Sequence, residues 1–402
     1  MIMANTRFSL EGDQLGRFHF RTDAAEMERR WKVTREAMRR QEIDCLVLWG
    51  DNQIFGGVQK YLTDLQVPVY PHGFLFSQEG ISIVGHGDWG GAACGDYLCC
   101  RDVLDNISVP FLPSICYTDS YPAEEFCKII RRHGWKRAGF VGMNILPAGV
   151  YKYMTETLAD VVFTDATDMM DEIKAVKSPY ELSLCEKAVR LHEDILAAVP
   201  TILRVGRTER EVSLALRHLA DDMYCSDFLV LTGAHPTAPG GNLYFYQNNT
   251  IQRGDYVYIL IELAGPGGIW AELGRTYSMG EPSAAMQKAW DDAVRLENDL
   301  ASMCIPGAKP GDVFQEGNRR LAAQGYAEEG HFFAHGQGYD IVDRPVFCKE
   351  EPMTLKENMY FSMHPRCKNK EAAAICVDNY VVTRDGGRRM SRVPQELVCI
   401  DY

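Results

Sequence analysis

The sequence lacks both an excess of basic residues and long apolar runs. Its 402 residues include 42 lysines and arginines against 55 aspartates and glutamates, giving a formal net charge of −13. A nucleic acid or an anionic membrane needs a basic surface on its partner, so we expect neither as a ligand. No run of about 18 apolar residues occurs, and the first residues hold no apolar stretch of signal-peptide length. We therefore expect a cytoplasmic protein without a membrane segment.

The cysteine pattern lacks the spacings of metal or redox motifs. The chain has 13 cysteines, scattered as single residues apart from Cys99 and Cys100. No CxxC spacing is present, although such a spacing is the usual signal of a zinc knuckle or a redox pair. Reduced cysteines pack as small apolar side chains. We expect most of these cysteines to be partly buried thiols.

The first part of the chain alternates helical and strand patterns and has no phosphate-binding loop. Apolar residues recur at helical spacing through residues 24–41, and an apolar run at 45–49 follows. The same order recurs at 123–132 and 138–142. No GxGxxG or GxxxxGK pattern lies at the ends of these strands, so nucleotide binding is not expected. Alternating helices and strands indicate an α/β domain with a mixed sheet over residues 1–170.

The pattern changes in the second part of the chain. An amphipathic stretch at 182–203 precedes Thr208 and Glu211, whose spacing is that of a helix capping box. From Gly254 onward the sequence predicts a β-hairpin, with a Gly-Pro-Gly-Gly turn between two strands that carry acidic residues. We expect residues 171–402 to form a second, α+β domain.

Four segments of this second domain occur in an order that a known family shares. They are EIKAVKSPYELSLCEKAV with VGRTEREV, RGDYVYILIELAGPGGIWAELGRT, AHGQGYDIVDRP, and LKENMYFSMHP followed by CVDNYVVTRDG. Together they resemble the leading helices, the acid-bearing hairpin and the later strand motifs of the methionine aminopeptidase, aminopeptidase P, proline dipeptidase and creatinase family. The resemblance implies a creatinase-type N-terminal domain followed by a pita-bread catalytic domain.

Only part of the metal site that this resemblance implies is present. The family holds two divalent ions with two hairpin acids, one histidine and two later acids, and the ions activate water for amide hydrolysis. Counting along the motifs places Glu272 at the second hairpin acid and His335 at the histidine. His364 stands where a glutamate usually precedes proline. Leu260 stands at the first hairpin acid, with Glu262 two residues later on the same strand face.

Two more positions depart from the family pattern. Val377 stands at the last acid, with Asp378 next to it on the opposite face, and Val342 replaces a second histidine. Too few oxygen ligands remain for two ions, so the sequence does not predict an ordinary metallopeptidase. The residues expected to act in catalysis are Glu262, Glu272, His335 and His364.

The sequence leaves three functions open. The main expectation is a creatinase-like hydrolase without a cofactor, in which histidines and glutamates act as general acids and bases on a C–N bond of a small, carboxylate-bearing nitrogen compound. The second possible function is that of a metalloenzyme, in which Glu272, His335 and His364 hold one Zn²⁺ or Fe²⁺ and leave one coordination position open. Such an enzyme is either a hydrolase or a lyase similar to the dimethylsulfoniopropionate-lyase branch of the family. That branch also has an added hairpin acid at the position of Glu262. The third is a binding protein without catalysis.

Four residues are expected to contact the substrate. Arg344 has the geometry to bind a substrate carboxylate, and Asp343 lies beside it in the same turn. His235 is a candidate pocket histidine, although its spacing from the hairpin is longer than the family's. The creatinase branch implies a homodimer in which the N-terminal domain of one subunit closes the other's site. Residues 51–64, including Tyr61, are therefore expected to line the partner's site.

Overall fold

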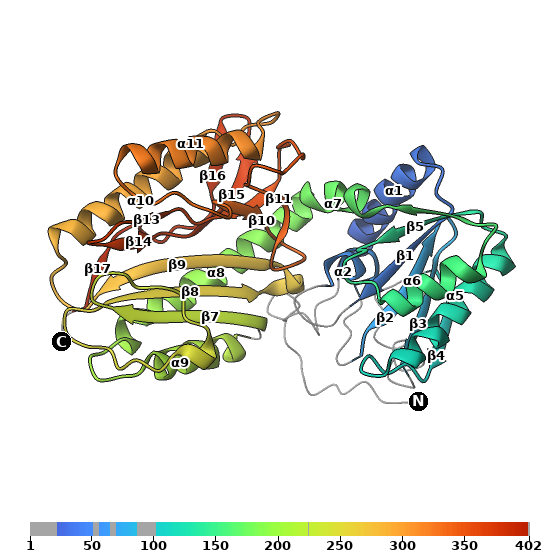
Figure 1. Cartoon of the computed structure of the whole chain (residues 1–402), viewed down its shortest axis with the longest axis horizontal. Coiled ribbons are helices and arrows are strands. Elements are labelled where there is room, and N and C mark those ends of the chain that lie inside the picture. The colour runs from blue at the N-terminus through green and yellow to red at the C-terminus, as the bar shows by residue number, and fades with distance from the viewer. Residues whose placement is uncertain (1–21, 51–55, 65–69, 87–101, 224, 401–402) are drawn as a thin grey trace. The chain divides into compact units, whose positions relative to one another are not determined.

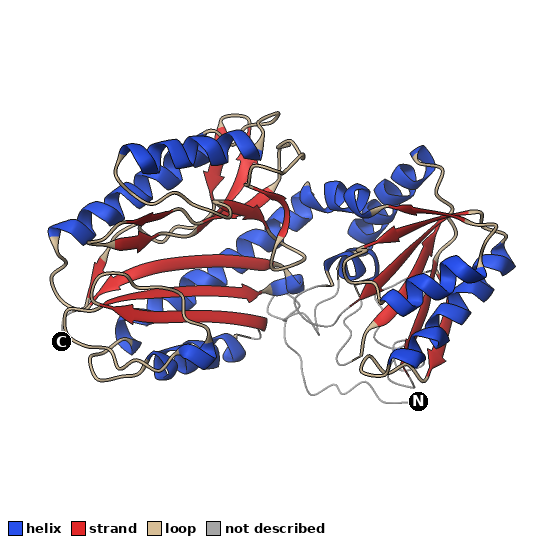
Figure 2. Ribbon diagram, viewed as in Figure 1, coloured by secondary structure: helices blue, strands red, loops and turns tan. Residues whose placement is uncertain are grey.

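The chain consists of two units, each built around its own sheets (Figures 1 and 2). The computed structural model describes residues 22–50, 56–64, 70–86, 102–223 and 225–400. The division between the units falls after Lys174. The boundary expected from sequence, between residues 170 and 171, lies inside helix α7 (Thr167–Ala175). Within the described ranges, no helix is long and apolar enough to cross a membrane.

The N-terminal unit contains a six-stranded sheet in the order β4-β3-β2-β1-β5-β6. Its strands are β1 (Cys45–Gly50), β2 (His72–Ser77), β3 (Ile81–His86), β4 (Val103–Val109), β5 (Arg137–Val141) and β6 (Val162–Asp165). Strand β1 pairs antiparallel with β2 and parallel with β5. The sheet is therefore mixed, which confirms the predicted α/β class of this unit.

Helices cover both faces of this sheet. They are α1 (Ala24–Arg40), α2 (Gly57–Thr63), α5 (Ser120–His133) and α6 (Ala148–Thr157). Successive residues of a strand point to opposite faces. Leu75 accordingly packs in the core formed with α5 and α6, while the ring of Phe76 meets Trp31 of α1 at 5.3 Å. The Trp31 indole donates a hydrogen bond to the carbonyl of Leu62 in α2, so α1 and α2 share the second face.

The C-terminal unit has two larger sheets and a two-stranded ribbon, flanked by two pairs of helices (Figure 2). One sheet has the order β17-β9-β8-β7, the other has the order β11-β10-β12-β15-β16, and β13 pairs with β14. The strands are β7 (Ser226–His235), β8 (Tyr256–Ala264), β9 (Trp270–Ser278), β10 (Ala334–Gly336), β11 (Asp343–Val346), β12 (Tyr360–Met363), β13 (Arg366–Lys368), β14 (Ala373–Ile375), β15 (Asp378–Thr383), β16 (Gly386–Arg389) and β17 (Val398–Cys399). The helices are α8 (Pro179–Ile202), α9 (Glu209–Asp222), α10 (Ala284–Ser302) and α11 (Pro310–Ala323).

Two apolar cores join the helices to the sheets. Leu196 of α8 and Leu216 of α9 pack with Ile261 of β8 in one core. Trp290 of α10 packs with Phe361 of β12 in the other. Each sheet thus has one face covered by helices, and its other face remains for the site. This is the pita-bread architecture that the sequence resemblance implied.

The face of the β8–β9 hairpin that the helices do not cover carries both apolar and acidic side chains. Ile259, Ile261 and Leu263 point into the core with α8 and α9. The intervening Leu260 and Glu262 therefore point to the other face. The turn is closed by a hydrogen bond from the Gly265 amide to the Ile269 carbonyl. The positive φ values of Gly267 and Gly268, 69° and 67°, explain why glycine is needed there.

Capping boxes begin both helices that lead into the hairpin. Thr208 accepts a hydrogen bond from the Glu211 amide, and the Glu211 carboxylate accepts one from the Thr208 amide, as predicted. Ser178 and Glu181 make the same pair of bonds at the start of α8. Each box satisfies two amides that the first helical turn leaves without carbonyl partners.

Candidate active site

Two buried glutamates stand opposite each other on the hairpin. Glu262 of β8 and Glu272 of β9 are register partners, and the two residues are 5% and 4% exposed. Residues directly opposite in an antiparallel pair share one face and have neighbouring Cβ atoms. The two carboxyl groups therefore face the interior of the unit together. Neither can be a solvated surface acid.

His335 approaches Glu272 from the second sheet. Its Nδ1 lies 2.9 Å from the carbonyl oxygen of Gly336, which can only accept, so Nδ1 carries a proton. Its Nε2 lies 3.5 Å from Glu272 Oε2. A backbone carbonyl that fixes the ring in this way is the usual support of a metal-binding histidine, because it leaves the other nitrogen for the ion.

His364 completes a group of three. Its amide donates to the carbonyl of Phe333, which holds the residue after β12 beside β10. The His364 and His335 rings lie 5.4 Å apart, and the ring of Phe332 contacts both edge-on. One ligand atom each from Glu272, His335 and His364 lies within 4.8 Å of the others.

The charges of these three residues are mutually adjusted. Burial raises the pKa of Glu272, but His335 and His364 outweigh it and the pKa of this carboxyl is lowered. Burial lowers the pKa of His335, yet the Glu272 carboxylate reverses this and raises it overall. The pKa of His364 is lowered, chiefly by burial. Glu272 is thus an anion and His364 a neutral imidazole, the states in which each can bind a metal.

Glu262 differs from its neighbour in protonation. Burial, followed by the adjacent Glu272 charge, raises the pKa of Glu262 well above its usual value. Its Oε1 accepts a 2.8 Å hydrogen bond from Gln337 Nε2. The carboxyl therefore carries its proton on Oε2. One site holds an anionic glutamate and a protonated one, an arrangement suited to acid–base chemistry.

The support of Glu262 was not found from sequence. The Glu272 amide donates to Asn379 Oδ1 at 2.8 Å, Asn379 Nδ2 donates to Gln337 Oε1 at 2.9 Å, and Gln337 donates in turn to Glu262. Because a backbone amide can only donate, it fixes the direction of every bond in this chain. Only the position of Gln337 in the motif, two residues after His335, could have drawn attention to it.

The geometry fits one divalent ion. Glu272 Oε2 is buried and has no hydrogen-bond partner among the described residues. An orphaned carboxylate oxygen facing two imidazoles is a costly arrangement unless a cation or a proton joins them. Two histidines and one carboxylate are a common catalytic set for Zn²⁺, with an open position left for water or substrate.

A second ion does not fit beside the first. Leu260 and Val377, at two of the positions where the family has acids, form a buried apolar cluster with Tyr258. An isolated bridge between Gly274 and Val377 brings this cluster together. Divalent ions of a two-metal site need several more oxygen ligands, and apolar side chains fill the place from which those would come.

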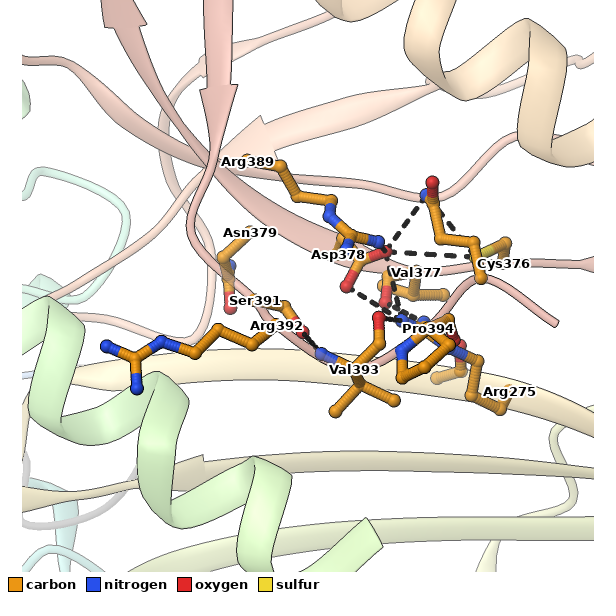
Figure 3. A network of polar contacts seen from close by, with 12 residues as sticks. Arg275, Cys376, Val377, Asp378, Asn379, Arg389, Ser391, Arg392, Val393 and Pro394 are labelled. Atoms are coloured by element: carbon orange, nitrogen blue, oxygen red, sulfur yellow. Dashed lines mark hydrogen bonds and ion pairs between the residues drawn. The ribbon is translucent and has the colours of Figure 1, made fainter. Parts of the chain in front are cut away.

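Asp378 is occupied by an internal network (Figure 3). Arg275 Nη2 donates to both carboxylate oxygens of Asp378, at 3.0 and 3.1 Å, and Arg389 and Gln395 donate to Oδ2. The carboxylate lies on the opposite face from Val377, as the sequence predicted. Although Asp378, Cys376 and Glu297 also have neighbouring ligand atoms, two arginines already neutralise this group. It is an ion-pair network that joins β9 of one sheet to β15 of the other.

Two of the other residues predicted to contact the substrate are held by partners within the chain. Arg344 donates through Nε and Nη2 to Glu351, at 3.2 and 2.6 Å, so its guanidinium fork already holds an internal carboxylate. Asp343 is buried, lies 3.8 Å from Lys177 Nζ and accepts from the Tyr339 amide.

His235 and Tyr61 have local contacts of their own. His235 is exposed at the end of β7, where Nδ1 accepts from the amides of Thr237 and Ala238. Tyr61 is fully buried within the N-terminal unit, under the guanidinium of Arg30. Residues 51–55 of the segment expected to line a partner's site, and the Cys99-Cys100 pair, lie outside the described residues.

Comparison with known proteins identifies the family and the fold. The model of metallopeptidase family M24 matches residues 183–384. An Xaa-Pro dipeptidase of Pyrococcus horikoshii is 21% identical over 285 residues, 68% of this chain and 78% of the relative. An uncharacterised peptidase of Bacillus subtilis is 23% identical over 67% of this chain and 77% of its own length. The crystal structure of an X-Pro aminopeptidase from Thermotoga maritima covers 92% of this chain and 99% of its own, with a TM-score of 0.77 and 16% identity, a likeness of fold.

One expectation from sequence is wrong. Loss of several acidic ligands favoured a site without any cofactor, yet the family model that the chain matches is one of metallopeptidases. The count of lost ligands argued against a pair of ions, and it was extended too far when a site without any ion was ranked above the alternative of a single one. The remaining Glu272, His335 and His364 satisfy the requirements of one ion.

Proposed function

The chain belongs to metallopeptidase family M24 and is a hydrolase of that family. On that premise, we propose that the protein binds one divalent ion and uses it to hydrolyse a C–N bond in a small, carboxylate-bearing nitrogen compound. The observation that carries this proposal is the group of buried Glu272, buried His335 and half-buried His364, beside an apolar cluster at Leu260 and Val377. The group supports one ion, and the cluster takes the space of a second. Zn²⁺ and Fe²⁺ both suit two imidazoles and a carboxylate.

Each residue of the site has a separate role in the proposed reaction. When bound, a divalent ion would supply a Lewis acid for the scissile carbonyl and for water. Glu262 holds a proton on Oε2 beside the site and can deliver it to the leaving nitrogen as a general acid. Gln337 keeps that carboxyl oriented, and Glu272 stays anionic opposite the two histidines. The apolar cluster excludes water from one side of the site.

A release assay tests the proposed reaction. We expect the metal-loaded protein to release free amine from N-acyl amino acids or other carboxylate-bearing amides faster than from Xaa-Pro dipeptides. Glu262→Gln should lower kcat by about 100-fold or more, because it removes the general acid. The matched variant Glu281→Gln, at an exposed acid after β9, should keep full activity. Preferential cleavage of Xaa-Pro dipeptides, or no release from any amide, would overturn the proposal.

A lyase is the second candidate, and one observation favours it. Glu262 occupies the position at which the dimethylsulfoniopropionate-lyase branch has an added acid, and it lies directly opposite Glu272. Turnover in water enriched in ¹⁸O separates the two reactions. Hydrolysis places solvent oxygen in the product carboxylate, whereas elimination leaves it unlabelled and yields an unsaturated product.

We further propose that the protein works as a cytoplasmic homodimer. The resemblance to the creatinase branch supports the dimer, and the ten described cysteines, all free, suit a reducing compartment. Light scattering of the purified protein should give twice the mass of one chain. A monomeric mass at micromolar concentration would contradict the dimer and leave the chemistry of the site unaffected.

A further inference from the structure

Arg366 is a cation beside the site that the proposed chemistry does not use. It begins β13, two residues after His364, so the two Cα atoms lie at most about 7 Å apart. Its register partner in the ribbon is Ile375. Ile375 packs against the cluster of Tyr258, Leu260 and Val377, which lines the site.

The direction of the Arg366 side chain follows from its neighbours on the strand. Cys367, the next residue, is buried in the core with α10 and α11. Because successive strand residues point to opposite faces and register partners to the same one, Arg366 shares the face of Ile375. Its charge also acts on the buried Tyr258 hydroxyl: burial and the Glu272 charge raise the pKa of that phenol, and Arg366 opposes them. The guanidinium therefore lies at the edge of the apolar cluster.

Arg366 has hydrogen-bonding capacity that the described residues do not fill. Its Nη2 donates to the carbonyl of Pro239 at 3.3 Å, and its Nε is buried with no partner in the described part of the chain. No carboxylate among the described residues lies within ion-pair distance of it. By contrast, Arg344 is bonded to Glu351.

We infer that Arg366 binds the anionic group of the substrate, a carboxylate, while the scissile C–N bond lies at Glu272, His335 and His364. This inference rests on the proposed function and narrows its substrate class. Leu260 belongs to the apolar cluster, and Leu231 packs against it. A suitable substrate has a carboxylate a few bonds from the C–N bond and an aliphatic portion between or beside them, as in an N-acyl derivative of an apolar amino acid.

Binding measurements test this subsite without depending on turnover. The probes are N-acetyl derivatives of alanine, leucine and phenylalanine, each compared with its neutral carboxamide by calorimetric titration. For at least one pair, the protein should bind the acid at least about tenfold more tightly than the amide. Arg366→Gln should abolish that preference, and Arg366→Lys should retain part of it, because lysine keeps the charge but not the fork.

A matched variant controls for net charge. Lys368→Gln removes a cation from the same strand and the same face but at an exposed position, and it should keep the full preference for the acid. In turnover, Arg366→Gln should raise KM for the acid about tenfold or more with kcat within a few-fold. Absence of any preference in the unaltered protein, or a preference that survives in Arg366→Gln, would overturn the inference. Preferential binding of the acid without hydrolysis of any probe would contradict the proposed function while leaving the subsite in place.

Discussion

Glu297 lies buried next to the Arg275–Asp378 ion pair, and its environment disfavours its charge. Burial and then the Asp378 carboxylate raise its pKa to about 8. Its Oε2 accepts a hydrogen bond from Gln395 Nε2 at 3.1 Å, a bond that a neutral group can also accept. Both arginines of this network pair with Asp378, and Glu297 is the acid that stays protonated near neutral pH.

This protonation has a consequence for stability. A carboxyl whose pKa is raised by folding binds a proton in the folded chain that the unfolded chain releases, so its stabilising effect falls as pH rises from 4.5 towards 8. In Glu297→Gln, the fall in the free energy of unfolding between pH 5 and pH 8 should shrink by about 1 kcal/mol or more. Urea denaturation at three pH values measures it, with the exposed Glu281→Gln as control. Parallel pH profiles for Glu297→Gln and the unaltered protein would refute the assignment.

Gln337 should matter for catalysis and not for metal binding. Gln337→Leu leaves Glu262 without its donor and Asn379 Nδ2 without its acceptor. We expect kcat to fall at least about tenfold while the metal content stays unchanged, because Gln337 has no hydrogen bond to any of the three ligand side chains. Gln315→Leu, an exposed substitution on α11, is the control. Loss of the metal together with activity would show that Gln337 supports the ligands instead.

At the residue scale, the sequence predicted which residues of each motif belong to the candidate site, and it missed the hydrogen bonds between residues of different motifs. Counting from Arg275 and from the His-Gly motif located Glu272 and His335, because both lie at fixed distances from recognisable neighbours. Gln337 bonds a residue 75 positions away and another 42 positions away. Only the pairing of distant strands creates such contacts, so no local spacing could have revealed them.

At the element scale, the hairpin face controls how much room the site has. A Cβ placed on Gly274 would lie 2.8 Å from Val377 Cγ2 and 2.9 Å from Leu260 Cδ1. Gly274 has an ordinary strand conformation, so its role is to allow the close approach of Val377. The same glycine sits opposite Leu260 in the register.

This close packing predicts a compensating pair of substitutions. Gly274→Ala should destabilise the protein by about 1–3 kcal/mol, because it overfills the cluster. Val377→Ala in the same chain removes the nearest obstructing methyl group, so the double variant should lose less stability than the sum of the two single variants. Chemical denaturation of all four proteins measures the coupling. Strict additivity would contradict the packing described here.

Several elements were predictable because their signals are local. Helix α1 ends one residue before its predicted end at residue 41, and α9 begins at the predicted capping box. The first hairpin strand ends where the Gly-Pro-Gly-Gly turn begins, and the second begins just after it. The strand order of the second sheet was not predictable, because β10 pairs with two strands that follow it at different distances along the chain.

At the scale of the whole molecule, the order of four segments was enough to predict the architecture. A pita-bread unit needs two helix-covered sheets, and the sequence supplies two leading helices, the hairpin and then a further helical stretch before the later strands. The cofactor was not predictable in the same way. Whether three remaining ligands converge depends on the contact between the two sheets, and counting residues along the chain does not measure that contact.

The metal content of the purified protein tests the central claim most directly. Elemental analysis after loading with Zn²⁺ or Fe²⁺ should find one tightly held ion per chain, lost in Glu272→Gln, His335→Ala and His364→Ala and retained in Glu262→Gln. Two ions per chain would contradict the apolar replacement at Leu260 and Val377. No bound ion, or an ion that persists in the His364→Ala variant, would contradict the site itself.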